Sequence, residues 1–328
     1  MQTEAGAMPN AVARAAELLE QLRQEIGRAV VGQNEAVEQV IVTLVACGHV
    51  LIEGVPGLGK TLLVRALAQA LSLNHARVQF TPDMMPADIT GHTVLNAVTH
   101  ELRVMRGPVF TNILLADEIN RAPAKTQSAL LEVMQEYQVT LEGQTLALPR
   151  PFVVLATQNP VETEGTYPLP EAQLDRFLLK VEIGYPNAAE EVALIQRTTL
   201  DRPGDQLPLA GVQQRLDERL VLGLQQLAAR QRVDETVVDY AVRIVRATRD
   251  WPGLALGSGS RGGIALVRAA RVAAMLDGRD YVTPDDIKRF ALPALRHRVG
   301  LTPDALLEGR RIADLLAAVV DSVPAPRA

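Results

Sequence analysis

Aromatic residues and cysteine are both scarce in this sequence. Phe, Trp and Tyr make up 3% of the 328 residues, so the core must be built from aliphatic side chains. The scarcity also argues against a surface that binds single-stranded nucleic acid by stacking bases on aromatic rings. Cys47 is the only cysteine, so no internal disulfide can form, as is usual in a reducing compartment. Because Cys47 lies in an apolar run, we expect a buried and unreactive thiol.

Long apolar runs and a strong basic excess are missing as well. No apolar stretch reaches the roughly 18 residues that a membrane-spanning helix needs. The N-terminus carries acidic residues and no apolar segment, unlike a secretory signal, so we expect a cytoplasmic protein. Residues 1–186 hold 13 basic and 20 acidic side chains, and residues 187–328 hold 20 and 18. Neither balance is typical of a dedicated nucleic-acid-binding protein.

Short apolar runs alternate with helical patterns in the first part of the chain. Several runs are apolar at nearly every position, as strands buried on both faces of a parallel sheet are. The alternation predicts a three-layer α/β domain around a parallel sheet. Residues 88–108 and 138–149 interrupt it with paired extended runs, which predict two inserted β-hairpins. The predicted sheet strands are 49–53, 77–80, 112–116, 152–156 and 177–183.

The chain length and a change of pattern predict two domains. A length of 328 residues exceeds what one small core usually takes. Beyond the α/β part the periodicity is helical throughout, and residues 237–248 carry one apolar stripe. The pair Thr283-Pro284 combines a capping hydroxyl with a proline at the first helical position. We therefore expect an α/β domain over residues 1–186 and an all-α domain over residues 187–328.

A glycine-rich loop at residues 54–61 (GVPGLGKT) matches the phosphate-loop pattern G-x-x-x-x-G-K-[ST]. Its glycines let backbone N–H groups face phosphate oxygens, the lysine can contact the β- and γ-phosphates, and the threonine hydroxyl can join a Mg²⁺ shell. The alternative, a glycine turn without a ligand, is disfavoured by the apolar strand and the helix that flank the loop. We predict that ATP binds here. The expected contact residues are Gly54, Val55, Pro56, Gly57, Leu58, Gly59, Lys60, Thr61 and Leu62.

Two further strand ends supply polar groups that ATP hydrolysis needs. One predicted strand runs into Asp117, which would hold Mg²⁺ together with Thr61, and Glu118, which would polarise the attacking water. Two adjacent acids are unremarkable alone, but the upstream phosphate loop favours the catalytic interpretation. Asn159 follows another apolar strand and could reach the water or the γ-phosphate. On its own, an asparagine before proline is more often a turn residue.

This ordered set of motifs resembles the MoxR family of AAA+ ATPases. The segments that carry the resemblance are GVPGLGKT, LLADEINR, ATQNP, LPEAQLDRF and GSGSRGG, and they span essentially the whole chain. The resemblance implies a AAA+ P-loop NTPase domain followed by a helical lid, near the magnesium-chelatase and CbbQ/NorQ branches. The hairpin in residues 88–108 would be the helix-2 insert, and the one in 138–149 the pre-sensor-1 hairpin.

The resemblance also implies roles for single residues. Asn159 would be sensor 1, Arg176 the arginine finger that enters a neighbouring subunit's site, and Arg261 sensor 2, acting either in its own subunit or across the interface. Val30, Val31, Gly32 and Gln33 would line the adenine pocket. From the residues alone, Arg176 could equally pair with a nearby surface acid, Asp175 or Glu171, and Arg261 could be an ordinary loop arginine.

A site that needs an arginine from a neighbour implies a homo-oligomer, which by resemblance is a hexameric ring. ATP and Mg²⁺ would be its ligands. The resemblance further implies that the ring remodels or activates client proteins, some of them metalloenzymes, with a partner that carries a von Willebrand factor A (VWA) domain. The alternatives are a nucleotide-gated binding scaffold and, less favoured by the charge balance, a nucleic-acid motor. The histidines show no ligand spacing, so no further metal site is expected.

Overall fold

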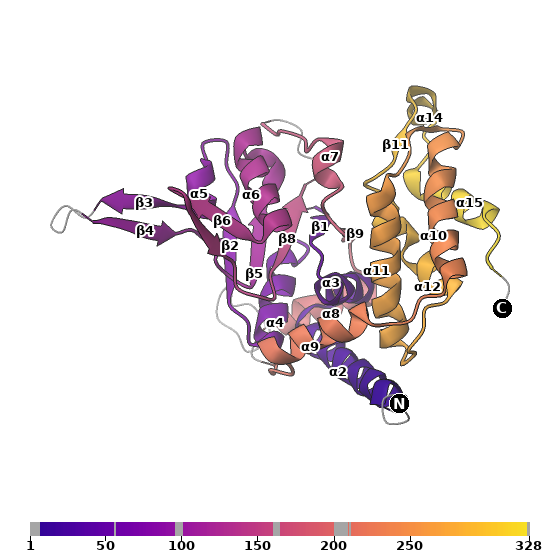
Figure 1. Cartoon of the computed structure of the whole chain (residues 1–328), viewed down its shortest axis with the longest axis horizontal. Helices are drawn as coiled ribbons and strands as arrows, with labels where there is room; N and C mark the ends of the chain where they lie inside the picture. Colours follow the sequence, from indigo (N-terminus) through magenta and orange to yellow (C-terminus); the bar gives the residue numbers. More distant parts are fainter. Residues whose placement is uncertain are drawn as a thin grey trace.

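Five strands form the central sheet of the structure (Figure 1), a computed structural model that describes residues 7–55, 57–95, 101–159, 165–199, 209 and 211–326. They are β1 (Val50–Glu53), β2 (His75–Gln79), β5 (Ile113–Asp117), β8 (Val153–Gln158) and β9 (Leu179–Glu182). Their order is β2-β5-β8-β1-β9, and every neighbouring pair is parallel. The predicted parallel sheet is therefore confirmed, with strand ends that differ from the prediction by at most two residues.

Helices cover both faces of this sheet. One face packs against α2 (Ala7–Ala29), α3 (Asn34–Val45) and α4 (Lys60–Leu71), and the other against α6 (Ala124–Glu136). Side chains along each strand alternate between the two layers: on β5, Ile113 and Leu115 face the first, whereas Leu114 and Ala116 face the second. Burial on both faces explains why the strands are apolar at nearly every position.

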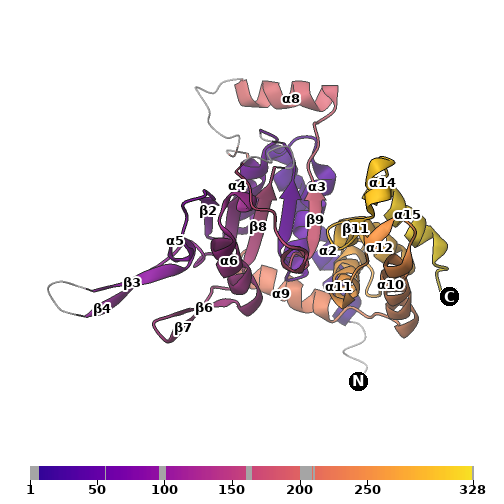
Figure 2. The ribbon, with the colours of Figure 1, turned by 90° about the horizontal axis from the view of Figure 1, so that it is seen from above.

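Two β-hairpins extend from the α/β domain, as predicted. The first pairs β3 (Gly91–Leu95) with β4 (Leu102–Arg106) and follows the short helix α5 (Pro86–Thr90). The second pairs β6 (Gln138–Leu141) with β7 (Gln144–Ala147). Figures 1 and 2 show the first hairpin pointing away from the sheet, on the side opposite to the C-terminal helices.

Helices make up most of the chain after residue 187. The helices from α10 (Glu235–Ala247) to α15 (Ile312–Ser322) form one bundle, which we call the lid (Figure 1). None of the helices that the structure describes is long and apolar enough to cross a membrane. Before residue 187 the chain also forms the 3-10 helix η1 (Ile119–Arg121) and the short helix α7 (Glu171–Leu174), and after it the 3-10 helix η2 (Thr248–Asp250). The helices are α8 (Ala188–Thr199), α9 (Glu218–Ala229), α10 (Glu235–Ala247), α11 (Ser260–Leu276), α12 (Pro284–Arg289), α13 (Ala291–Leu295), α14 (Pro303–Leu307) and α15 (Ile312–Ser322).

The expectation of a purely helical C-terminal part is wrong in one detail. Strand β10 (Leu254–Leu256) pairs antiparallel with β11 (Gly300–Leu301) inside the lid. These strands are three and two residues long, too short to leave a periodic pattern in the sequence. Pairing between two distant segments creates them.

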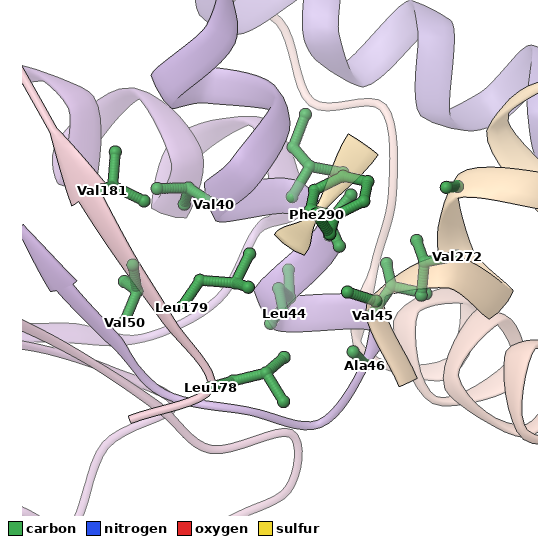
Figure 3. Close-up of a cluster of buried hydrophobic side chains, with 14 of the residues drawn as sticks. Val40, Leu44, Val45, Ala46, Val50, Leu178, Leu179, Val181, Val272 and Phe290 are labelled. Carbon is green, nitrogen blue, oxygen red and sulfur yellow. The ribbon is translucent and has the colours of Figure 1, made fainter. Parts of the chain in front are cut away.

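The lid and the sheet share one apolar core. Helix α3 lies between them, with Val40 beside Val181 of β9 and Val45 beside Val272 of α11 (Figure 3). Phe290, at the junction of α12 and α13, is 1% exposed in the same cluster. The lid is thus held at the β9 edge of the sheet by burial of apolar side chains.

Cys47 follows α3, where the chain bends toward β1 with a φ of +53°. Its side chain is half-buried, so the expectation of a fully buried thiol is wrong. Burial nevertheless raises the pKa of the Cys47 thiol. Because the thiolate is the reactive form, a raised pKa keeps this cysteine unreactive near neutral pH.

A buried ion pair connects the N-terminal helix to the segment that leads into α9. Glu25 of α2 is 2% exposed, and its Oε1 accepts a hydrogen bond from Arg215 Nε at 2.8 Å. The backbone N–H of Gln213 donates to Glu25 Oε2 at 3.2 Å, and Arg28 Nη1 lies 3.0 Å from the same oxygen. Burial raises the pKa of Glu25, but the bonds from Arg215 and Gln213 outweigh it, so the net pKa is lowered.

We expect Arg215→Met to lower the free energy of unfolding by about 3 kcal/mol at pH 7, because it leaves a buried carboxylate short of a partner. The lowered pKa means that this stabilisation is present above the unfolded-state pKa of about 4.3 and is lost as pH falls through the folded-state value. Urea unfolding at several pH values measures both effects. Arg23→Met, at the exposed pair with Glu20, is the control and should change stability little. If the difference in free energy of unfolding between the wild-type chain and Arg215→Met grows as the pH falls, Arg215 does not stabilise the ionised form of Glu25.

Candidate functional site

The glycine-rich loop joins the carboxyl end of β1 to the first residue of α4. Gly57 and Gly59 have φ values of +86° and +81°, a backbone region that favours glycine. At Gly54 a side chain is excluded for another reason, because a Cβ there would lie 2.7 Å from the carbonyl oxygen of Ile183. Pro56, predicted to belong to this loop, lies outside the described residues. The N-terminus of α4 directs its backbone N–H groups toward the loop, as phosphate-binding helices do.

A pocket of about 690 Å³ lies over this loop. Of the described residues predicted to bind nucleotide, Gly32, Gly54 and Val55 do not line it. Lys60 Nζ donates to the carbonyl oxygen of Gly54 at 2.6 Å and lies 3.5 Å from that of Gln158 at the end of β8. The predicted residues that line the pocket are Val30, Val31, Gln33, Gly57, Leu58, Gly59, Lys60, Thr61, Leu62, Asp117, Glu118 and Asn159.

Asp117, at the end of β5, is held by bonds to both carboxylate oxygens. The hydroxyl of Thr157, a buried residue of β8, donates to Oδ1 at 2.6 Å, and Arg77 Nη2 of β2 donates to Oδ2 at 2.6 Å. Asp117 and Thr61 line the same pocket and offer the oxygen ligands that Mg²⁺ prefers. The donor set therefore fits a Mg²⁺ ion carried by a nucleotide.

Glu118 occupies an unusual backbone conformation, with a φ of +56°. Such left-handed geometry costs a non-glycine residue roughly 1–2 kcal/mol. The bond from its backbone N–H to Thr157 Oγ1, at 2.9 Å, holds it in place. Its carboxylate Oε2 lies 2.8 Å from Arg121 Nε in the turn that follows. Strain of this kind, held by a buried neighbour, is characteristic of functional positions.

The far end of the pocket is apolar. Val30 and Val31, Pro186, and the α8 residues Leu194 and Ile195 line it together. These side chains can bury the faces of a planar base, the chemistry expected for an adenine site.

Gly32 lies directly behind this apolar wall. With its φ of +74°, a Cβ at Gly32 would lie 2.8 Å from Glu190 Oε2. Gln33 Nε2 donates to the carbonyl oxygen of Gly184 at 2.8 Å, which ties the segment to the chain after β9. Gly32 thus shapes the apolar end without lining it.

Arg176 and Arg261 lie near the amino ends of the sheet strands, whereas the phosphate loop lies at their carboxyl ends. They line a second pocket, of about 290 Å³, near the amino end of β9. Arg176 Nη1 donates to the carbonyl oxygen of Leu131 at 2.7 Å, while its buried Nε has no acceptor among the described residues. Arg261 Nη1 lies 3.7 Å from Asp175 Oδ2. Neither arginine reaches the phosphate pocket of its own chain.

Several pocket residues were missed by the sequence interpretation. Arg77 and Gln79 stand two positions apart on β2, a polar alternation that was visible in the sequence. Their position beside Asp117 depends on β2 pairing with β5, which the sequence alone did not settle. The α8 residues, and Thr157, which bonds to both acids without lining the pocket, offered no signal beyond an ordinary helix and strand. Among the described residues, no cluster of three or more His, Cys, Asp and Glu side chains could hold a further metal ion.

Two family profiles match the chain. The profile of the ATPase family associated with various cellular activities (AAA) matches residues 49–179, and that of the AAA lid domain matches residues 246–319. The first match runs from the residue before β1 to the first residue of β9. The domain boundary predicted near residue 186 falls between the two matches and stays a prediction.

Relatives of known sequence and structure extend this likeness to nearly the whole chain. Chaperone MoxR1 of Mycobacterium tuberculosis is 46% identical over 301 residues, covering 88% of this chain and 78% of that protein. YeaC, an uncharacterized protein of Bacillus subtilis, is 45% identical over 309 residues, covering 94% and 95%. A candidate ATPase from Cytophaga hutchinsonii, whose crystal structure is solved, is 37% identical, with a TM-score of 0.89 over 99% of both chains.

The fold and the site define a P-loop AAA+ protein with an AAA lid. The chain belongs to the MoxR family of AAA+ ATPases. The predicted fold class and family resemblance are thereby confirmed.

Replacing Thr157 by Val should lower kcat for ATP turnover about tenfold with little change in KM, because it removes the hydroxyl that positions Asp117 and Glu118 without touching the phosphate loop. Thr157→Ser, which keeps the hydroxyl, is the matched control. Steady-state ATPase rates give kcat and KM, and the affinity for a fluorescent ATP analogue checks that nucleotide binding is unchanged. An equal loss of kcat in both variants would contradict this role, because Thr157→Ser keeps the hydroxyl.

Proposed function

We propose that the chain binds ATP with Mg²⁺ in the 690 Å³ pocket and hydrolyses it. The main support is the convergence of the phosphate loop, two acids and an asparagine from three adjacent strands. Lys60 would neutralise charge on the β- and γ-phosphates. Thr61 and Asp117 would hold Mg²⁺, which stabilises the charge that develops on the phosphate oxygens.

Glu118 is suited to accept a proton from the attacking water. It is placed beyond the end of β5 by its backbone bond to Thr157, and Asn159 follows β8 on the neighbouring strand. The amide of Asn159 can orient the same water or contact the γ-phosphate. Arg121 contacts Oε2 of Glu118, so the other carboxylate oxygen is the one that would accept the proton.

We further propose that the site works across an interface between identical subunits, as a ring. From Phe177, next to Arg176, to Ile183, beside Gly54, the chain spans roughly 20 Å at about 3.3 Å per residue. That length exceeds the reach of an arginine side chain. This distance supports a role for Arg176 in the pocket of another copy. Arg261 lines the same second pocket and would act beside it. A head-to-tail repeat of such contacts would form a ring where the rotation closes. The hexameric number rests on the family resemblance.

Mixing two inactive variants tests this arrangement. Glu118→Gln should lower kcat by about 10²-fold or more, because it removes the base. Arg176→Ala should lower it by about 10³-fold, because it removes the charge supplied to the neighbour. In equal mixture, a pocket from the Arg176→Ala subunit can face an intact Arg176 on a Glu118→Gln subunit. Random assembly should then restore about a quarter of wild-type turnover.

The control for this experiment mixes Glu118→Gln with Lys60→Ala. Both changes lie in the same pocket, so every subunit in the mixture lacks either Glu118 or Lys60. No pocket is complete, and no recovery of activity is expected. If the Arg176→Ala mixture recovers no more activity than this control, the arrangement across an interface is wrong.

We propose that turnover by the ring remodels or activates client proteins, together with a VWA-domain partner. The name of the relative MoxR1, a chaperone, supports a role in handling other proteins. The first hairpin offers a surface for contact, since Val94, Leu95, Leu102 and Met105 are 44–68% exposed. Exposed apolar side chains gathered on one element mark interaction sites. The VWA partner and the metalloenzyme clients rest on the family resemblance.

A Glu118→Gln chain saturated with ATP and Mg²⁺ should hold its client, because release would require turnover. Affinity capture with this variant, against Lys60→Ala as a control that lacks nucleotide binding, should enrich a VWA-domain protein. Client activation that persists with Glu118→Gln would favour a nucleotide-gated scaffold. Recovery of nucleic acid, with ATPase stimulation that falls steeply with salt, would favour a motor instead.

A further inference from the structure

Arg298 extends from the lid to the amino end of β9. Its side chain is 3% exposed, and each of its five N–H donors has an acceptor. Nε donates to Asp175 Oδ1 at 2.7 Å. Nη2 donates to the carbonyl oxygens of Asp175 and Phe177, at 3.1 and 2.6 Å, and Nη1 donates to those of Leu178, at 3.1 Å, and Ala294. Four of these five acceptors belong to the segment Asp175–Leu178.

Arg176 lies inside that segment. The carbonyl groups on both sides of it, at Asp175 and Phe177, are bound by one guanidinium group of the lid. His297, the residue before Arg298, adds a contact of 3.0 Å between its Nε2 and the Phe177 carbonyl oxygen. The backbone that carries Arg176 is therefore fixed by the lid and not by β9 alone.

Asp175 connects the same contacts to Arg261. Its Oδ1 is bound by Arg298, and its Oδ2 lies 3.7 Å from Arg261 Nη1. Among the residues that the structure describes, Asp175 is the only carboxylate that lines the 290 Å³ pocket, and four arginines line it as well. One carboxylate thus sets the separation between two guanidinium groups that repel each other, those of Arg261 and Arg298.

A lid anchor does not need a charge. Phe290 anchors the same lid by apolar burial, without the cost of removing a guanidinium from water. The bonds of Arg298 are concentrated on the residues around Arg176, whereas the neighbouring Arg296 pairs with Glu182, at the carboxyl end of β9, at 2.6 Å. Arg296 thus ties the lid to the carboxyl end of β9, whereas Arg298 ties it to the residues around Arg176.

We propose that Arg298 is a positioning residue for ATP hydrolysis in the neighbouring subunit. It holds the backbone of Arg176 directly and the side chain of Arg261 through Asp175, so that both cations meet the neighbour's phosphates in one fixed arrangement. This rests on the proposed function across the interface. Misplacement of a catalytic group by about 1 Å can cost about 10²-fold in rate.

Arg298→Ala should therefore lower kcat by about 10²-fold, with an unchanged KM for ATP, because its own pocket lies at the other sheet edge. Mixed with Glu118→Gln, it should recover about a quarter of wild-type turnover, as Arg176→Ala does. Arg296→Ala is the matched control: it removes a lid-to-strand ion pair two residues away and should keep wild-type kcat. Asp175→Asn, which keeps the size of the side chain, should lower kcat about tenfold through loss of one charged bond.

The mixtures separate the possible failures. An Arg298→Ala chain that keeps wild-type kcat overturns the proposal. So does one that loses activity but is not complemented by Glu118→Gln while Arg176→Ala is, because Arg298 would then act on its own pocket or on folding. If Asp175→Asn and Arg296→Ala behave alike, Asp175 has no special part and the proposed link to Arg261 fails. If Arg176→Ala is not complemented either, the function across the interface and the role of Arg298 are both wrong.

Discussion

Parallel pairing of neighbouring strands is the constraint on which this structure depends. It directs the carboxyl ends of β5, β8 and β1 to one edge of the sheet, where the phosphate loop, the acids and the asparagine meet. The same pairing directs the amino ends to the other edge, where Arg176 and Arg298 lie. Because the strands keep these edges apart, one chain presents a pocket on one side and cations on the other. This geometry supports the proposed division of the site between subunits.

A buried network then sets the details at the carboxyl edge. Thr157 bonds to both acids at once, through the side chain of Asp117 and the backbone of Glu118. Arg77 donates a hydrogen bond to Oδ2 of Asp117. The left-handed backbone of Glu118 is held by the bond from its N–H to Thr157. The positions of Asp117 and Glu118, at the end of β5, therefore depend on Thr157 of the neighbouring strand β8.

Local patterns made the sheet and the phosphate loop predictable. Strands buried on both faces leave continuous apolar runs, and the glycine loop needs particular residue types at fixed spacing. Contacts between distant segments left no such trace. Arg77 and Asp117 are 40 residues apart, Arg298 and Asp175 are 123 apart, and the lid strands are too short to show a period. The burial of Cys47 was predicted wrongly, because an apolar run does not reveal where the chain bends.

The sequence by itself determined the chemistry of the phosphate loop, the acids that follow β5 and the family to which the chain belongs, because each depends on residues close together in the chain. Only the tertiary structure decided which edge of the sheet each arginine occupies. It also showed that α8 lines the apolar end of the pocket and that the lid binds the backbone around Arg176. The physical reason is that strand order and lid docking arise from burial of apolar surface shared among many segments, which no single motif encodes.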